Sequence, residues 1–424
     1  MYDLIIYLYL LGVAVTSLFK DKVRKMWLGE RAAFDVLREK IDPAERYVWF
    51  HAASLGEFEQ GRPLMERLRR EHPELKILLT FFSPSGYEVR KNYEGADVIC
   101  YLPLDTPLNV RRFFSLVQPA MAFFIKYEFW YNYLHELKRR QIPVYSVSSI
   151  FRHGQVFFRW YGRQYGRVLK CFTHFFVQNE VSRDLLATLG IDCVSIVGDT
   201  RFDRVLDIKA AARQLPVVET FLSKRSAIEE QPQVFIAGSS WPPDEQLFIP
   251  YMKAHPQIKL IIAPHVVSEQ HIADIMAQLK GLRVMRYKAA AKAIETGDKD
   301  AATGIEEANV LIIDNYGLLS SIYRYATISY IGGGFGVGIH NVLEAAVWGV
   351  PVLFGPNNKR FQEAQALIAT GGGFEVNSPE DFELIMGRLT NDPDHRNEAA
   401  SKAAALVASQ AGATDKVYRH AFGQ

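Results

Sequence analysis

The chain has 424 residues, enough for two or three domains, and its charged (23%) and apolar (49%) fractions are typical of a soluble globular protein. Its 49 basic residues nearly balance its 47 acidic residues, which argues against nucleic-acid binding across the surface. The three widely spaced cysteines, Cys100, Cys171 and Cys193, indicate reduced packing residues and argue against a disulfide framework or a zinc site.

The chain begins with an almost wholly apolar run, Leu4–Phe19, which is followed closely by Lys20, Lys22, Arg24 and Lys25. A secretory signal has the opposite order, with its basic residues first. The run therefore predicts a membrane anchor that either spans the bilayer at a tilt or lies in its plane, with the remainder of the chain in the cytoplasm. A buried first helix of the globular domain is the alternative.

Strand-like apolar runs then alternate with spacers long enough for helices, such as 61–71 and 106–117. This rhythm is typical of βαβ units and a parallel sheet. The predicted strands of the first half are 47–51, 76–80, 97–102, 120–125, 143–148 and 173–178. A more polar stretch, 199–232, separates them from a second set: 234–238, 259–264, 310–314, 327–333 and 350–355.

The sequence therefore predicts an α/β protein of two doubly wound, Rossmann-like domains that face a cleft. We place the anchor at residues 1–20, the first domain at 21–205 and the second at 206–424. The Ala-rich tail, 398–422, is predicted to be helical and to pack back across the domains.

Two carboxylates follow predicted strands of the first domain. Glu57 comes after the strand YVWFH and the sequence AASLG, and Glu128 comes after the strand AMAFFI and Lys126-Tyr127. A glutamate at the carboxyl edge of a sheet can act as a general base, although acidic residues also favour the first turn of a helix for dipole reasons. Polar turns follow two other strands, TFFSPSG at 80–86 and SSIFR at 148–152, and offer hydroxyls and a guanidinium for an anionic group.

The second domain contains the most informative segment, IGGGFGVGIHNVLEAAVWGVPVLFGP at 331–356. An apolar strand runs into five glycines within seven residues, and a helix is predicted to open at Asn341. Glycines allow close approach of a ligand to the backbone, and a helix N-terminus favours negative charge. The spacing matches neither the NTPase nor the dinucleotide fingerprint, so it indicates a sugar-nucleotide site. Asn341 and Glu344 also fit an ordinary capping pair.

The sequence offers no clustered histidine or cysteine motif for a metal and no nucleophile elbow of a serine hydrolase. We therefore expect neither a metal nor another cofactor.

Taken in order, HAASLGE, TFFSPSG, YLPLD, KYEFWYN, GDTRFD, AGSSW and the glycine-rich segment resemble the bacterial Kdo transferases, which attach 3-deoxy-D-manno-octulosonic acid (Kdo) to the lipid A precursor. The resemblance covers nearly the whole chain. It implies a GT-B glycosyltransferase of lipopolysaccharide biosynthesis that is inverting and metal-independent. It further implies CMP-Kdo as donor, the lipid A precursor as acceptor, and the cytoplasmic face of the inner membrane as location.

Carried over by motif, the resemblance makes Glu57 the general base and Glu128 the second catalytic glutamate. The acceptor-binding residues that we predict lie in the first domain: Ser54, Gly56, Ser83, Ser85, Lys126 and Arg152. The donor-binding residues that we predict lie in the second domain: Gly238, Ser239, Pro264, His265, Gly333, Gly334, Gly336, Gly338, His340, Asn341 and Glu344.

The chain departs from the family pattern at several positions. Lys126 replaces the first glutamate of the family motif E-x-E-x-W-P-N, and Tyr131 replaces its proline. Where the family usually has P-R-H, this chain has Pro264 followed directly by His265, without the arginine. Two alternatives remain at this stage: another GT-B transferase or epimerase acting on a UDP-sugar, and a membrane-anchored binding protein without catalytic activity.

Overall fold

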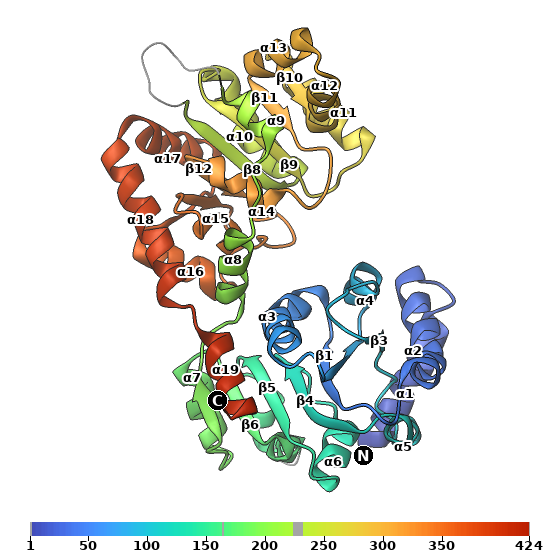
Figure 1. The fold of residues 1–424 in the computed structure, drawn as a ribbon. Helices are drawn as coiled ribbons and strands as arrows, with labels where there is room; N and C mark the ends of the chain where they lie inside the picture. The colour runs from blue at the N-terminus through green and yellow to red at the C-terminus, as the bar shows by residue number, and fades with distance from the viewer. Residues whose placement is uncertain (1, 163–164, 224–231, 424) are drawn as a thin grey trace. The chain divides into compact units, whose positions relative to one another are not determined.

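The computed structural model describes residues 2–162, 165–223 and 232–423, and it divides into two compact units. Unit 1 comprises Met1–Arg204 together with Gln410–Gln424, and unit 2 comprises Val205–Ser409 (Figure 1). The chain passes from one unit to the other within helix α8 (Arg201–Ala210) and returns after Ser409.

Unit 1 is built on a seven-stranded, all-parallel sheet of order β3-β2-β1-β4-β5-β6-β7. The order reverses between β1 and β4, which is the topological switch point at which doubly wound folds bind ligands. The strands are β1 (Tyr47–Ala52), β2 (Lys76–Phe81), β3 (Val98–Tyr101), β4 (Pro119–Ile125), β5 (Val144–Ser149), β6 (His174–Val177) and β7 (Val194–Ile196).

Helices cover both faces of this sheet, so its central strands are buried on both sides and read as continuous apolar runs. Alternate side chains of β1 enter different cores: Trp49 packs in one cluster and Val48 and Phe50 in the other. The helices of unit 1 are α1 (Tyr2–Thr16), α2 (Asp21–Lys40), α3 (Leu55–Glu71), α4 (Pro84–Arg90), α5 (Pro107–Leu116), α6 (Tyr131–Arg139), α7 (Glu180–Ala187) and α19 (Ala413–Phe422).

Unit 2 repeats the architecture with a second seven-stranded parallel sheet, of order β10-β11-β9-β8-β12-β13-β14, whose switch point lies between β8 and β12. Its strands are β8 (Val234–Ser240), β9 (Lys259–Pro264), β10 (Val284–Arg286), β11 (Val310–Ile312), β12 (Ile328–Ile331), β13 (Val352–Phe354) and β14 (Gly373–Glu375). Its helices are α9 (Pro216–Phe221), α10 (Pro242–Ala254), α11 (Glu269–Gln278), α12 (Tyr287–Thr296), α13 (Lys299–Glu307), α14 (Leu319–Ile322), α15 (Leu343–Ala346), α16 (Gln362–Thr370), α17 (Pro379–Asn391) and α18 (Pro393–Ser409).

The predicted class, α/β with two doubly wound parallel sheets, is confirmed. Each of the 11 predicted strands corresponds to a strand of the structure, whereas β7, β10 and β14 were not predicted. These three are edge strands of three residues each, and their side chains are mostly half-buried. Strands so short and only partly covered lack the apolar run by which the central strands are recognised.

The C-terminal tail, which the sequence predicts to be helical, forms two helices. Gly412 adopts a left-handed conformation (φ 98°) and separates α18, in unit 2, from α19, in unit 1. Both oxygens of the Asp203 carboxylate accept hydrogen bonds here, from Gly412 N (2.5 Å) and Thr414 N (2.6 Å). Val417 and Tyr418 of α19 are fully buried in a core of unit 1. The last residues thus join the first unit, whereas the sequence prediction assigned them to the second domain.

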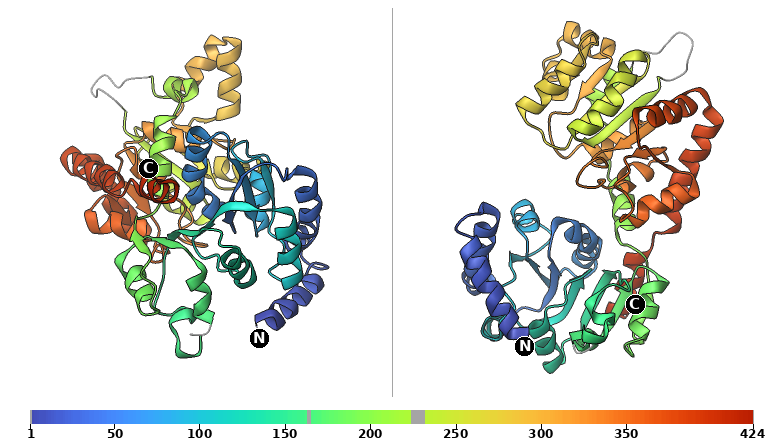
Figure 2. Two further views of the ribbon diagram at one scale, coloured as in Figure 1. Left: turned by 60° about the horizontal axis from the view of Figure 1, so that its bottom comes forward. Right: turned by 180° about the vertical axis from the view of Figure 1, so that it is seen from behind.

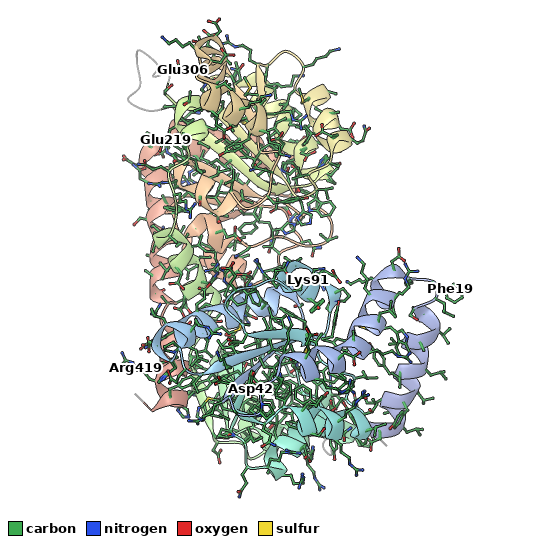
Figure 3. The ribbon with its side chains drawn as sticks, turned by 45° about the vertical axis from the view of Figure 1, so that its right-hand side comes forward. Phe19, Asp42, Lys91, Glu219, Glu306 and Arg419 are labelled. Carbon is green, nitrogen blue, oxygen red and sulfur yellow. The ribbon has the colours of Figure 1, made fainter. Side chains whose placement is uncertain are left out.

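The N-terminal residues form an antiparallel pair, α1 and α2, at the side of unit 1 beside β3 and α5 (Figures 1 and 2). Phe19, in the turn between the two helices, projects away from the unit (Figure 3). α1 presents Leu4, Leu8 and Leu11 to solvent but buries Ile6 and Val13. Among the described residues, no helix combines the length and the apolar character required to cross a membrane.

Candidate active site

The two predicted catalytic glutamates lie at the switch point of unit 1. Glu57 is in the first turn of α3, after β1, and Glu128 is in the loop after β4, the neighbouring strand. Because parallel neighbours end at the same edge of a sheet, the two carboxylates converge. Their electrostatic interaction is large enough to contribute to the pKa of Glu57.

Glu57 is half-buried, and its pKa is raised. Burial, followed by the nearby Glu128 carboxylate, raises the pKa of Glu57 to about 7. Hydrogen bonds from the backbone, including Ala53 N at 2.6 Å, and the positive charge of Lys126 act in the opposite direction. The backbone hydrogen bond from Ser54, the N-cap residue of α3, is also a helix-capping contact, so Glu57 serves the local fold as well as presenting a carboxyl group that titrates near neutrality.

Glu128 is held by two donors. Trp130 Nε1 donates to Glu128 Oε2 at 2.7 Å, and His51 Nε2 lies 3.1 Å from the same oxygen. His51 is the penultimate residue of β1 and is fully buried. The sequence motif placed His51 beside Ser54 and Glu57, but its contact with Glu128, 77 positions later, depends on the pairing of β1 with β4.

A hydrogen-bond chain fixes which nitrogen of His51 carries its proton. Trp49 Nε1 can only donate, and it donates to Thr80 Oγ1 at 2.8 Å. Thr80 Oγ1 lies 2.8 Å from His51 Nδ1 but 3.4 Å from the carbonyl oxygen of Phe50, so we infer that its hydroxyl donates to the histidine. Nε2 then bears the proton and donates to Glu128. Trp130 Nε1 also lies 3.1 Å from Nε2, but its shorter hydrogen bond, of 2.7 Å, goes to Glu128 Oε2. The chain Trp49–Thr80–His51–Glu128 therefore runs in one direction and ends on a carboxylate.

The predicted acceptor residues of the first two loops lie next to Glu57. Ser54 is the N-cap residue of α3 and Gly56 follows it in the first turn, where a Cβ would meet no atom within 4 Å. Ser83 caps α4 by accepting a hydrogen bond from Ser85 N, and Ser83 N donates to the carbonyl oxygen of Ala53 at 2.7 Å. The loops after β1 and β2 are thus joined directly.

The cationic candidates come from the next two loops. Lys126 directly follows β4 and adopts a left-handed conformation (φ 65°), which non-glycine residues rarely do. Its ammonium group lies 5.4 Å from the centre of the Tyr127 ring. Arg152, after β5, approaches the Tyr127 hydroxyl at 3.4 Å. Lys126 and Arg152 therefore flank Tyr127 beside the two glutamates, and all six predicted acceptor residues belong to loops at one edge of the sheet.

Asp105 is a buried residue of this edge that we did not assign a role, although it ends the motif YLPLD. Its carboxylate accepts hydrogen bonds from the backbone N–H groups of Asn132 (2.9 Å) and Tyr133 (3.0 Å) and from the Tyr2 hydroxyl (2.7 Å). Burial raises the pKa of Asp105 to about 7. It thereby fixes the start of α6, which directly follows Trp130, and ties α1 to the same loop.

In unit 2 the glycine-rich loop follows β12 at the switch point. Gly333 and Gly338 have positive φ (93° and 112°), and the carbonyl oxygen of Gly333 accepts hydrogen bonds from the backbone N–H groups of Gly336 and Gly338. A Cβ on Gly334 would overlap the backbone of Gly355 in the loop after β13. The glycines are thus required by a tightly folded loop, and they do not by themselves establish a ligand.

Asp244, in the first turn of α10, is a residue that the sequence prediction missed. Its carboxylate accepts hydrogen bonds from Gly333 N (2.9 Å), Trp241 N (2.9 Å) and the hydroxyl of Tyr330 (2.8 Å). It therefore joins the loop after β8 to the loop after β12. Its only sequence signal is an acidic residue at the third position of a helix, three residues after Trp241.

Two predicted donor residues, His265 and His340, stack on one another with ring centres 4.4 Å apart, and the ring of Trp241 stacks on His265 at 4.8 Å. Burial lowers the pKa of both histidines, that of His340 to about 4, so both are uncharged at neutral pH. Trp241 Nε1 donates to His340 Nε2 at 3.2 Å, which leaves the proton of His340 on Nδ1.

The remaining donor candidates end β8 and β9. Gly238 lies where a Cβ would overlap the hydroxyl of Tyr323, Ser239 has a left-handed conformation (φ 53°), and Pro264 is the last residue of β9. His265 N donates to the carbonyl oxygen of Ser240 at 2.9 Å, so the two loops pack against each other. The structure thus brings Gly238, Ser239, Pro264, His265 and the glycine-rich loop to one edge of the second sheet.

The predicted helix at Asn341 is much shorter than expected. α15 spans only Leu343–Ala346, because Gly349 adopts positive φ (69°) and Pro351 cannot continue a helix. Asn341 Nδ2 donates to Glu344 Oε1 at 3.2 Å, and Asn341 Oδ1 accepts from Leu343 N. Both side chains therefore serve the turn itself, and the expected contribution of a long helix dipole to phosphate binding is withdrawn.

Among the described residues, no group of three or more histidine, cysteine, aspartate or glutamate side chains is arranged to hold a metal ion. Asp314, which follows β11, is instead paired with Arg286 at 2.9 Å.

Comparison with known proteins supports the resemblance drawn from the motifs. Residues 28–204 match the family model described as 3-deoxy-D-manno-octulosonic-acid transferase (kdotransferase). A 3-deoxy-D-manno-octulosonic acid transferase of Aquifex aeolicus is 26% identical over 365 residues, which cover 83% of this chain and 89% of the relative.

Solved structures show the same fold at low identity. A UDP-GlcNAc 2-epimerase from Neisseria meningitidis superposes with a TM-score of 0.55 (15% identity, 86% of this chain and 99% of the other). MurG of Acinetobacter baumannii superposes with a TM-score of 0.55 (13% identity, 89% and 100%). These likenesses concern the two-sheet architecture alone.

Proposed function

From its similarity to the Kdo transferases, we propose that this chain transfers Kdo from CMP-Kdo to the lipid A precursor in lipopolysaccharide biosynthesis. The supporting sequence matches extend over most of the chain, and the family model falls on the unit that carries Glu57 and Glu128. The observation that carries the proposal is the environment of Glu57: a half-buried carboxyl group at the switch point, with a pKa of about 7, next to a second glutamate.

The proposed reaction is a single displacement. Glu57 takes the proton from an acceptor hydroxyl, whose oxygen forms a bond to the anomeric carbon of Kdo. The bond from that carbon to the phosphate oxygen breaks, and its electron pair leaves with CMP, so the anomeric configuration inverts. A base with a pKa near the working pH is suited to this step because it is partly ionised and still a useful proton acceptor.

In this proposal the acceptor binds to unit 1 and the sugar nucleotide to unit 2, as in GT-B enzymes. Lys126 and Arg152 provide positive charge for anionic groups of the acceptor. In unit 2, the Nδ1–H of His340 is the donor that we assign to the phosphate of CMP, because the N–H groups of Gly333, Gly336 and Gly338 already donate within the fold. His265 and His340 are uncharged at neutral pH, so they bind through hydrogen bonds and ring contacts rather than through charge.

We further propose that the protein works at the cytoplasmic face of the inner membrane, with α1 lying in the interface. Three features support this location: the exposed leucines of α1, the exposed Phe19 at its end, and the basic run that starts at Lys20. An amphiphilic helix with a basic flank binds anionic lipid surfaces in this way.

The test is a transfer assay with purified protein, CMP-Kdo and the lipid A precursor, read by the mass of the lipid product. We expect a mass gain of one or more Kdo units, and a loss of about 100-fold or more in kcat/KM for Glu57→Gln. Glu88→Gln, an exposed glutamate of α4, is the matched control and should retain parental activity. No transfer from CMP-Kdo, or transfer only from UDP-sugars, would refute the proposed donor. Unchanged activity of Glu57→Gln would refute the base.

A further inference from the structure

A second candidate site lies in unit 1, where α1 and α2 meet α5 and the loop after β3. These elements enclose a cavity of about 290 Å³, lined by Leu10 of α1, by Glu30, Arg31 and Phe34 of α2, and by Arg112 of α5. The volume is close to the lower limit of small-molecule sites and far exceeds the space of one water molecule. None of these residues belongs to the proposed transfer site.

Glu30 is the feature that points to a ligand. The residue is only 6% exposed, and its Oε1 has no hydrogen-bond partner within the part of the chain that the structure describes. A buried carboxyl oxygen without a partner costs free energy, so native proteins usually provide one, from the protein or from a bound molecule. Tyr101 Oη, close enough to interact electrostatically with Glu30, is also buried without a partner among the described residues.

Two arginines at the mouth of the cavity supply positive charge. The Arg31 guanidinium lies over the ring of Trp27, and the Arg112 guanidinium lies over the ring of Phe34, each 4.1 Å from the ring centre. Neither forms an ion pair with a carboxylate of the described residues, Glu30 included. Stacking on a ring fixes the plane of a guanidinium and leaves its N–H edge available, which is the arrangement that binds phosphate oxygens bidentately.

The protonation of Glu30 is compatible with an anion. Burial raises the pKa of Glu30 to about 8, so at neutral pH the carboxyl group is mostly uncharged and can donate its O–H. The cavity then carries two positive charges and a neutral hydrogen-bond donor. Three tyrosines lie close enough for Glu30 to act on their pKa values, and they remain neutral phenols because burial raises those values: Tyr9, Tyr101 and Tyr133.

The apolar surroundings select an amphiphile rather than a free anion. Leu10, Phe34 and Leu104 line the cavity, and the α1 surface outside it exposes Leu4, Leu8 and Leu11. A ligand whose phosphate meets the arginines can lay a hydrocarbon chain along this surface and remove apolar area from water. We propose that the cavity between α1, α2 and α5 is a binding site for the phosphate group and adjoining chain of a phosphorylated lipid.

The experiment measures binding of dihexanoyl phosphatidic acid to the full-length protein by titration calorimetry, in the absence of sugar nucleotide. Two control ligands are titrated separately: dihexanoylglycerol, which has the chains without the phosphate, and inorganic phosphate, which has no chains. We expect saturable binding of the phosphatidic acid, and at least tenfold weaker binding of each control ligand. Phosphate that binds as tightly as the lipid would overturn the assignment to a lipid, and absence of saturable lipid binding would overturn the site.

Variants locate the binding within the molecule. Arg31→Ala and Arg112→Ala should each lower the affinity for the lipid at least fivefold. Arg111 is the neighbouring exposed arginine of α5 and does not line the cavity, so the affinity of Arg111→Ala should remain within twofold of the parent's. Glu30→Gln keeps a donor and should retain binding, and Glu30→Leu should lose it while the free protein stays folded. Equal losses in all three arginine variants, or full binding by Glu30→Leu, would contradict the site. Because no transfer is measured, these outcomes are independent of the proposed enzymatic activity.

Discussion

Replacing Glu128 with glutamine should make the acidic limb of the pH–activity profile move to lower pH. Burial and the Glu128 carboxylate together raise the pKa of Glu57 to about 7, and the Glu128→Gln change removes the second cause while keeping the shape of the side chain. A nearby like charge shifts a carboxyl pKa by on the order of one unit. Since a general base works only when ionised, the limb of kcat/KM should move from about pH 7 toward about pH 6.

The size of the effect follows from the ionised fraction. With a pKa of about 7, about one tenth of Glu57 is ionised at pH 6, and with a pKa of about 6 about one half is ionised. Relative to its own plateau at pH 8.5, Glu128→Gln should therefore be about fivefold more active at pH 6 than the parent, whatever its plateau rate. This normalisation separates the titration of Glu57 from any direct role of Glu128 in the transfer.

Lys126 provides the opposite perturbation. Its positive charge lowers the pKa of Glu57, so Lys126→Met should raise that pKa and move the acidic limb to higher pH, by less than Glu128→Gln moves it to lower pH. At pH 7 this variant should therefore be less active than the parent when both are scaled to their plateaus. The assay is initial-rate transfer from CMP-Kdo between pH 5 and 9, with Lys91→Met, an exposed lysine at the end of α4, as control. Limbs that stay in place, or that move in the same direction in both variants, would refute the assignment of Glu57 as the titrating base.

Three further changes test the parts of the structure that support the sites. Thr80→Val removes the acceptor of Trp49 and the donor to His51, so it should lower kcat about tenfold at constant KM. Thr80→Ser keeps the hydroxyl and should restore activity. Equal activity of the two variants would contradict the hydrogen-bond chain. Asp244→Ala leaves three hydrogen-bond donors unpaired, so it should destabilise unit 2 by about 3 kcal/mol in urea unfolding. It should also raise KM for CMP-Kdo. An unchanged KM would show that the glycine-rich loop does not need this carboxylate. Asp203→Ala should cost about 1–2 kcal/mol and expose the C-terminal helix to proteolysis, which protection equal to the parent would disprove.

The sequence was sufficient for the central strands and for the order of units along the chain, because buried parallel strands are continuous apolar runs with a loop at each end. It was insufficient where local pattern competes with tertiary context. The edge strand 284–286 has half-buried side chains and no apolar run, and the helix expected at Asn341 is ended by Gly349 after a few residues. The break at Gly412 divides a tail whose composition favours one helix.

Site residues followed the same rule. Glu57 and Glu128 could be placed at one edge of the first sheet because each comes shortly after a recognisable strand and lies in a motif of its own. Asp244 could not, because its partner Gly333 is 89 positions away and only the adjacency of β8 and β12 brings them together. The same holds for Glu30, whose meaning depends on a cavity formed by three helices and a loop rather than on its neighbours in sequence.

The departure at Lys126 acquires a physical meaning from this geometry. The Kdo transferase pattern has a glutamate at this position, which would place a third carboxylate near Glu57 and Glu128 and raise the pKa of the base further. Lysine replaces that repulsion with attraction, so Glu57 stays ionised to lower pH than it would beside glutamate. The same ammonium adds positive charge to the edge of the sheet where the anionic acceptor is proposed to bind. The substitution is therefore compatible with the proposed chemistry: Glu57 and Glu128 are both present, and Lys126 lowers the pKa of the proposed base.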